Sequence, residues 1–280
     1  MPGEQRYSLT QLLRVKDWLH ILGITLLGML YVSREMPSGM FPLWALIVAS
    51  LYLAHGYSMN TCLDLRYGGI ISAEYFYRGL AFSYCLFLLN CLIAYHLSLY
   101  ILGIVIIGSL ACLAYSARPL RLKRFIASNL ALNSFGFSML FLLGVVAASG
   151  RIGPASFIAT AFFFLIFIPL QLVHHIAHTE EDRGQRISAL HIRYGMKVAV
   201  FALKAAFLVI TCWVLFIPLP LPKVLALFFA TVLLSVILSR VINVMSNDDR
   251  LDIELAGRVR RIFRAAYSIY GLIIAVIFYI

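Results

Sequence analysis

Nine long apolar runs, separated by short polar segments, occupy most of this 280-residue chain. An α-helix needs about 20 mainly apolar residues to cross a bilayer, and each run approaches that length. Within lipid, only helices and closed barrels satisfy all their backbone hydrogen bonds. The sequence therefore predicts an all-α integral membrane protein: nine transmembrane helices in a single bundle, forming one domain over residues 1–280. The predicted spans are about 18–33, 41–59, 79–96, 98–115, 125–149, 154–174, 197–218, 221–243 and 262–280.

The composition supports this class of protein. Hydrophobic residues make up 62% of the chain and charged residues 12%, against about 45–50% and about 25% in soluble domains. The five cysteines form no CxxC pair and lie mostly inside apolar runs, which is typical of buried thiols.

The basic residues predict how the helices are oriented. If the N-terminus is cytoplasmic, 19 of the 23 Lys and Arg residues fall in segments on that side. Cytoplasmic loops carry such an excess of basic residues. The net charge of +11 then reflects topology and contact with anionic lipid rather than nucleic acid. We expect a bacterial or archaeal plasma membrane, with the polar chemistry facing the cytoplasm.

Two polar segments on the predicted cytoplasmic side contain candidate ligands at helical spacing. In SMNTCLDLRYGG, Asn60 and Asp64 are four residues apart, so a helix places both on one face. In QLVHHIAHTEED, a helix would align His174, His178 and Asp182, with His175 and Glu181 beside them. Taken alone, Asn60 and Asp64 could instead mark a helix end with a solvated carboxylate.

Two further cytoplasmic segments are charged. YSARPLRLKR, residues 115–124, has four basic residues in seven positions, and NDDRLDIELAGRVRR spans 247–261. The first could be an ordinary basic loop, and we interpret the second as a solvated loop. Carboxylates and amides suit a hard cation such as Mg²⁺, imidazoles suit softer ions, and clustered Arg and Lys suit phosphate. Together they predict a metal-bridged phosphate or diphosphate site in front of an apolar chamber that holds a lipid tail.

These segments resemble motifs of the UbiA superfamily of intramembrane prenyltransferases, over nearly the whole chain. YSARPLRLKR is close to that family's YS-x-P-P-x-R-L-K-R, and SMNTCLD matches the first half of its N-x-x-x-D-x-x-x-D motif. HTEEDRGQRISALHIRYG is similar to its second Asp-rich motif, and LLRVKDW and GGIISAEYF resemble two further family segments.

The resemblance implies a nine-helix fold and transfer of a prenyl group from a polyprenyl diphosphate to an acceptor, usually an aromatic ring. Mg²⁺ would bridge the diphosphate to the Asp-rich motifs, and Asp64 and Asp182 would be the catalytic residues. The implied metal ligands are Asn60, Asp64, His174, His178, Glu181 and Asp182. The implied diphosphate-binding residues are Arg66, Tyr115, Arg121 and Lys123.

The chain also departs from the family pattern. The second acidic position of the first motif falls on Gly68, and leading positions of the second fall on His174 or His175 and His178. Mn²⁺ or another transition metal therefore becomes a candidate beside Mg²⁺.

Two alternatives remain open: a terpene cyclase on the same fold, and a non-catalytic relative that binds an isoprenoid or lipid. A redox or metal-transport protein built on HHxxH is less favoured, because transporters place their ligands near the bilayer midplane. The expected partners are a polyprenyl diphosphate, an acceptor that the sequence does not identify, and membrane lipid.

Overall fold

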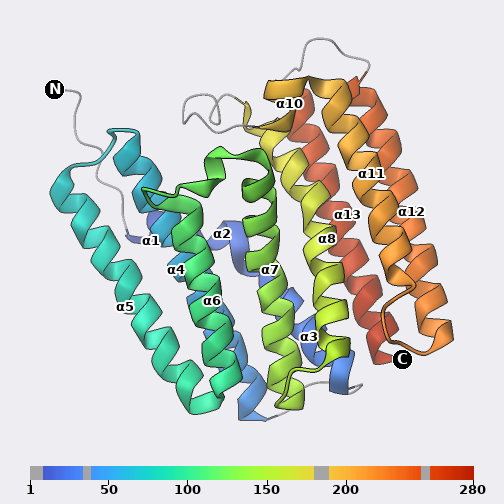
Figure 1. The fold of residues 1–280 in the computed structure, drawn as a ribbon, viewed down its shortest axis with the longest axis horizontal. Coiled ribbons are helices and arrows are strands. Elements are labelled where there is room, and N and C mark those ends of the chain that lie inside the picture. Colours follow the sequence, from blue (N-terminus) through green and yellow to red (C-terminus); the bar gives the residue numbers. More distant parts are fainter. Residues whose placement is uncertain (1–8, 34–38, 180–188, 247–252) are drawn as a thin grey trace. The chain divides into compact units, whose positions relative to one another are not determined.

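The computed structural model describes residues 9–33, 39–179, 189–246 and 253–280. These residues are helical apart from their connections, and they contain nine helical segments long and apolar enough to cross a membrane (Figure 1). The prediction of an all-α membrane protein with nine spans is confirmed. The segments are Gln11–Ser33, Met40–Tyr67, Ala73–Leu97, Leu99–Ser116, Ile126–Ser149, Pro154–Ala177, Met196–Val214, Leu221–Asn243 and Gly257–Tyr279.

The second span differs most from its predicted bounds. It was expected over 41–59, but helix α4 runs from Met40 to Tyr67. A helix of 28 residues is about 42 Å long, which exceeds the roughly 30 Å thickness of the hydrocarbon layer. The helix therefore continues beyond the apolar run, and its last two turns are formed by polar sequence.

The chain groups into two compact units, and the predicted single domain stays a prediction. The first unit comprises residues 1–122 and 139–152, and the second comprises 123–138 and 153–280. Helix α7 (Ile126–Ser149) contributes its first half to the second unit and its second half to the first.

In the first unit, α4 packs along both α5 (Ala73–Leu97) and α6 (Leu99–Ser116), which also pack on each other (Figure 1). Serines at the two helix starts satisfy backbone groups that a helix leaves unpaired. The hydroxyl of Ser72 accepts from Tyr75 N at 3.2 Å, and that of Ser98 accepts from Tyr100 N at 3.1 Å. The polar break predicted near Ser98 is therefore the capped start of a new helix.

The N-terminal part of this unit is segmented into α1 (Leu9–Leu13), α2 (Val15–Trp18), the 3₁₀ turn η1 (Leu19–Leu22) and α3 (Gly23–Ser33). Helix α3 packs closely against α7 at two glycines. A Cβ at Gly28 would collide with the carbonyl of Phe141, and one at Gly144 with the carbonyl of Thr25. Small residues of this kind let membrane helices approach backbone to backbone.

The second unit contains α8 (Pro154–Ala177), the short α10 (Leu190–Tyr194), α11 (Met196–Val214), α12 (Leu221–Ser246) and α13 (Ile253–Tyr279). Helix α8 packs on α11 and α13, and α12 packs on the same two helices. Side-chain donors tie these neighbours to backbone carbonyls. Trp213 Nε1 donates to Ile158 O at 3.1 Å, and Tyr267 Oη donates to Ile166 O at 3.0 Å. Such bonds add to the packing that associates helices in lipid.

Candidate functional site

The polar end of α4 carries the candidate site of the first unit. The sequence from Ser58 to Tyr67 contains neither Gly nor Pro, so the helix continues until Gly68 and Gly69, where Gly69 has a φ of 69°. Helical spacing places Asn60, Asp64 and Tyr67 on one face of α4.

The end of α6 contacts this face through a hydroxyl. Ser116 is fully buried, and its Oγ donates to Asn60 Oδ1 at 2.7 Å. This hydrogen bond fixes the position of the Asn60 amide oxygen relative to α6. An sp² oxygen has a second lone pair, so the same atom can also accept a metal ion.

The loop after α6 folds over Tyr67. Arg118 N donates to Tyr67 Oη at 3.1 Å. The guanidinium carbons of Arg118 and Arg121 lie 4.6 and 4.7 Å from the centre of the Tyr67 ring. Both distances are within the roughly 6 Å range of cation–π attraction, so one aromatic ring positions two cations of this loop.

Arg121 is the cation that reaches the carboxylate. Its Nη2 lies 4.0 Å from Asp64 Oδ1, and its side chain is 5% exposed against 19% for Asp64. The backbone of Arg121 has a φ of 39°, in the left-handed region, which costs energy for a residue with a Cβ. The residue with this unfavourable backbone conformation is the same one whose guanidinium lies next to Asp64.

The donor set at this end of α4 fits a hard cation. Asn60 and Asp64 offer amide and carboxylate oxygens one helical turn apart, with Arg121 beside them. Mg²⁺ is commonly held by one or two carboxylates together with substrate phosphate oxygens. The arrangement can thus hold a magnesium ion through protein oxygens while a guanidinium meets the phosphate that the ion also binds.

The other residues predicted to bind diphosphate lie as follows. Arg66 is exposed, with its guanidinium carbon 6.0 Å from the centre of the Phe76 ring in α5. Tyr115 is half-buried in the last turn of α6. Lys123 is 1% exposed in the 3₁₀ turn η2 (Leu122–Arg124), and it belongs to the second unit. The structure therefore brings Arg121 to Asp64, while Arg66 contacts an aromatic ring of α5.

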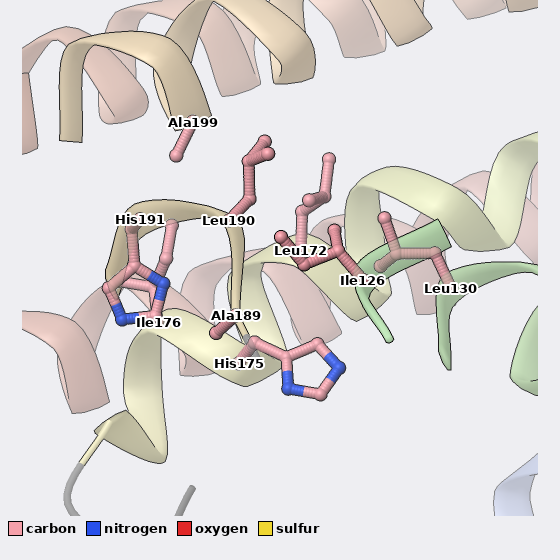
Figure 2. A pocket seen from close by; sticks show the side chains of 9 residues that line it. All are labelled: Ile126, Leu130, Leu172, His175, Ile176, Ala189, Leu190, His191 and Ala199. Carbon is pink, nitrogen blue, oxygen red and sulfur yellow. The ribbon is translucent and has the colours of Figure 1, made fainter. Parts of the chain in front are cut away.

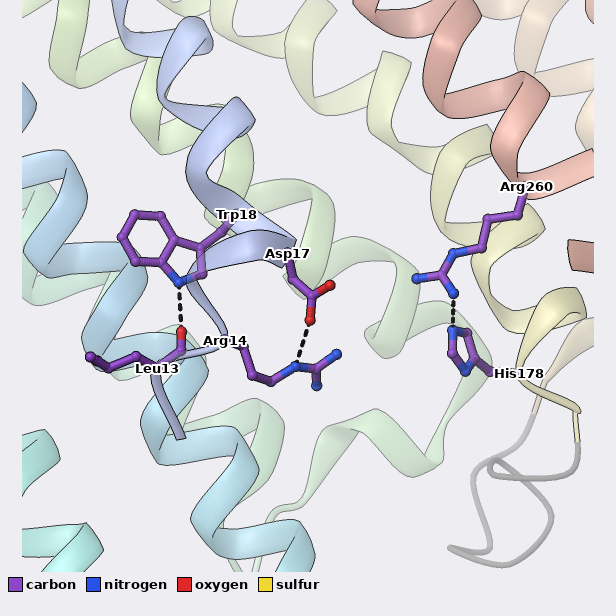
Figure 3. Close-up of polar contacts among 6 residues, drawn as sticks. All are labelled: Leu13, Arg14, Asp17, Trp18, His178 and Arg260. Carbon is purple, nitrogen blue, oxygen red and sulfur yellow. Dashed lines mark hydrogen bonds and ion pairs between the residues drawn. The ribbon is translucent and has the colours of Figure 1, made fainter. Parts of the chain in front are cut away.

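The histidine cluster lies at the end of α8 in the second unit. The helix ends at Ala177, and His178 caps it, with its backbone N–H donating to His174 O at 3.1 Å. The rings of His174 and His178 have centroids 4.5 Å apart. Figure 3 shows Nη1 of Arg260, in α13, donating to Nε2 of His178. The Nε2 atom of His178 is therefore already hydrogen-bonded to the guanidinium of Arg260.

The acidic part of the second motif, including Glu181 and Asp182, lies outside the described residues. Within the described ranges, no group of three or more His, Cys, Asp or Glu side chains is arranged to hold a metal ion. The ligand roles of His174, His178, Glu181 and Asp182 stay predictions.

A small pocket lies beside this cluster in the second unit (Figure 2). Its cavity volume is about 10 Å³, room for about one water molecule and far below the roughly 300–1,000 Å³ typical of ligand sites. Of its lining residues, His191 accepts or donates a 2.7 Å hydrogen bond with Thr179 Oγ1, which ties α10 to the end of α8. This pocket therefore has the features of a packing gap. Its lining residues are Ile126, Leu130, Leu172, His175, Ile176, Ala189, Leu190, His191 and Ala199.

Two residues of the first-unit site were not predicted from the sequence. Tyr67 is three positions after Asp64, so helical spacing would have shown it if the second span had been extended past residue 59. Ser116 follows Tyr115 in YSARPLRLKR, and the sequence analysis predicts only Tyr115 of these two as a diphosphate ligand.

Both the sequence and the fold resemble those of known proteins. Residues 21–262 match the UbiA prenyltransferase family. No curated protein sequence gives a significant match. A UbiA homologue from Archaeoglobus fulgidus bound to DMAPP and Mg²⁺ has a similar fold, with 13% identity, a TM-score of 0.75, and 96% of this chain and 99% of that chain covered.

Two other solved structures are similar in fold. A structure concerned with digeranylgeranylglyceryl phosphate synthase in membranes has 18% identity and a TM-score of 0.73, with 97% of each chain covered. The apo UbiA homologue from Aeropyrum pernix K1 has 16% identity and a TM-score of 0.61, with 91% of this chain and 98% of that chain covered.

Proposed function

The chain belongs to the UbiA prenyltransferase family, and we propose that it is an intramembrane prenyltransferase. Its donor would be a polyprenyl diphosphate, and its acceptor an aromatic compound or a lipid. The observation that carries this proposal is the convergence of Asn60, Asp64 and Arg121 at the polar end of α4. These are the groups that a metal-bound diphosphate requires.

We assign the metal to the oxygens of Asn60 and Asp64, with Ser116 holding the amide in place. Mg²⁺ bound there would neutralise charge on the leaving diphosphate and so favour cleavage of the bond between prenyl C1 and oxygen. Arg121 would bind the diphosphate oxygens beside the carboxylate, and the Tyr67 ring would keep its guanidinium in that position. Arg66, Tyr115 and Lys123 are further candidates for diphosphate contacts.

The reaction is a substitution at the prenyl carbon. The C1–O bond of the donor breaks, and the electron pair leaves with the diphosphate. A new bond then forms between C1 and the acceptor, which releases a proton. Apolar helix surfaces exclude water from a reactive allylic carbon and so prevent its hydrolysis.

Two kinds of observation support this assignment. The Archaeoglobus fulgidus homologue was solved with DMAPP and Mg²⁺, and also with GPP and Mg²⁺. In the present chain the first acidic motif keeps Asn60 and Asp64 on one helix face, beside an arginine from the YSARPLRLKR loop. Mg²⁺ is thus our first choice of metal, and Mn²⁺ the second because of the histidines near the second motif. We propose that the site faces the cytoplasm.

The proposal is tested by product analysis. The purified protein is incubated with C10, C15 and C20 prenyl diphosphates, Mg²⁺ or Mn²⁺, and a membrane extract that supplies acceptors. A prenylated acceptor supports transfer, whereas a cyclic hydrocarbon without acceptor would identify the terpene cyclase alternative. Absence of every product with all three donors would contradict an enzymatic function and favour the non-catalytic lipid-binding relative.

A further inference from the structure

Two lysines lie on the outer surface of α11, inside the segment Met196–Val214 that is long and apolar enough to cross a membrane. Lys197 and Lys204 are seven residues apart, so they share one stripe of the helix. The same stripe carries Phe201 and Leu208, which are 72% and 67% exposed. Both lysines are exposed as well. In a membrane this stripe therefore faces lipid, and it carries two cations.

The stripe lies on the side of α11 that points away from α8. Helix α11 packs on α8 and α12, and the indole of Trp213 faces α8, where it donates to Ile158 O. Lys204 precedes Trp213 by nine positions, which is about two and a half turns of an α-helix. The ammonium group of Lys204 therefore projects from the opposite side of α11.

Lys204 lies deep within the span. It is about 12 Å along the helix from Met196, at 1.5 Å per residue. A cation at that depth on a lipid-facing surface is costly, and long basic side chains there extend toward the head groups. Because Cα–Cβ bonds tilt toward the N-terminus of a helix, the Lys204 side chain leaves α11 in the direction of Lys197. Both ammonium groups thus extend toward the head groups at the start of α11.

The neighbouring helix contributes a third cation at a similar level. Helix α12 follows α11 after the short connection 215–220, and the two helices run antiparallel, side by side (Figure 1). From that connection, Lys197 lies about 26 Å along α11 and Arg240 about 29 Å along α12. Arg240 is exposed, near the end of the segment Leu221–Asn243. Three basic side chains from two adjacent helices therefore gather near one membrane surface.

We propose that Lys197, Lys204 and Arg240 bind the head group of an anionic phospholipid, whose acyl chains lie along Phe201 and Leu208. A head-group phosphate accepts hydrogen bonds from ammonium and guanidinium groups. Basic residues next to a membrane surface attract anionic lipids, so the charge of this surface is complementary to such a lipid. The site lies on the outer surface of the second unit, and the inference does not depend on the proposed transfer reaction.

Native mass spectrometry of the full-length protein in detergent tests this inference. The probes are phosphatidylglycerol, which is anionic, and phosphatidylcholine, which has no net charge. The variants are Lys204→Leu, Arg240→Gln and the double variant Lys197→Gln/Lys204→Gln. Lys16→Gln is the matched control, because Lys16 is an exposed lysine of α2 in the first unit. Lys204→Leu places an apolar side chain against lipid, so this variant should stay folded, and thermal unfolding verifies that each variant does.

We expect the wild type to bind phosphatidylglycerol more tightly than phosphatidylcholine. Loss of one basic residue should weaken the binding of phosphatidylglycerol about 5-fold, and the double variant should weaken it about 25-fold, as for basic residues near an anionic membrane surface. Lys16→Gln should match the wild type. Equal affinity of the wild type for the two lipids, unchanged binding by Lys204→Leu and the double variant, or an equal loss in Lys16→Gln overturns the inference. Because no prenyl donor is present, these results are independent of whether transfer occurs.

Discussion

Replacing Tyr67 should weaken catalysis by releasing the loop that carries Arg121. Tyr67 makes three contacts that hold this loop: a 3.1 Å hydrogen bond from Arg118 N and two cation–π contacts at 4.6 and 4.7 Å. A neutral hydrogen bond contributes about 0.5–1.5 kcal/mol. A cation–π contact contributes about 0.5–1 kcal/mol at an exposed cation such as Arg118 and about 2 kcal/mol at a buried one such as Arg121. Tyr67→Leu removes all three contacts, and Tyr67→Phe removes only the hydrogen bond.

The sums give distinct expectations for the two variants. Tyr67→Leu should lose about 3–4.5 kcal/mol of positioning energy, which corresponds to a decrease in kcat/KM of roughly 160- to 2,000-fold. Tyr67→Phe should lose about 0.5–1.5 kcal/mol, or roughly 2- to 13-fold. If Arg121 mainly binds the donor diphosphate, the change should be larger in KM than in kcat.

The assay is steady-state prenyl transfer in detergent at saturating Mg²⁺, with the donor varied. Tyr100→Leu is the matched control, since Tyr100 is 52% exposed at the opposite end of α6 from the loop. Wild-type kinetics in Tyr67→Leu would refute the positioning role. Equal losses in Tyr67→Leu and Tyr67→Phe would assign the effect to the hydroxyl rather than to the ring.

Three other variants test separate parts of the structure. Ser116→Ala removes the 2.7 Å hydrogen bond to the side-chain amide oxygen of Asn60. It should raise the Mg²⁺ concentration for half-maximal activity by roughly 2- to 13-fold, and an unchanged Mg²⁺ dependence would contradict this. Gly144→Ala places a Cβ against the Thr25 carbonyl, so it should lower the free energy of unfolding by about 1–3 kcal/mol and reduce the thermal midpoint. Gly103→Ala is the control, because a Cβ there meets open space, and it should leave the midpoint unchanged. Tyr267→Phe removes a 3.0 Å hydrogen bond to the α8 carbonyl of Ile166 and should lower the free energy of unfolding by about 0.5–1.5 kcal/mol. Thermal unfolding measures this loss, and activity should be retained below the transition.

The nine spans could be predicted because bilayer thickness sets the length of an apolar run that crosses it. The same rule misplaced the end of α4, since hydropathy reports where the hydrocarbon ends and not where helical hydrogen bonding ends. The polar turns through Asn60 and Asp64 stay helical until the glycines at 68 and 69. The predicted shared face of these two residues follows from their spacing alone.

The contacts that complete the candidate site could not be predicted in this way. The approach of Arg121 to Asp64 depends on a left-handed backbone at Arg121 and on an aromatic ring 54 positions earlier in the sequence. The bond between Arg260 and His178 joins residues 82 positions apart. Pairings of this kind arise from tertiary packing, and no local pattern of residues encodes them.

The central claim is that Asp64 holds the metal ion that assists ionisation of a prenyl diphosphate. Diphosphate release measures this ionisation most directly. Release from C10 to C20 donors would be followed with Mg²⁺, Mn²⁺ and Zn²⁺ in turn, and with EDTA. The comparison is between the wild type, Asp64→Asn, and Glu74→Gln as a control that neutralises an exposed carboxylate of α5. We predict release by the wild type and by Glu74→Gln that needs a divalent metal, and loss of at least about 100-fold in Asp64→Asn. Release by Asp64→Asn at the wild-type rate, or release that persists in EDTA, would contradict the account.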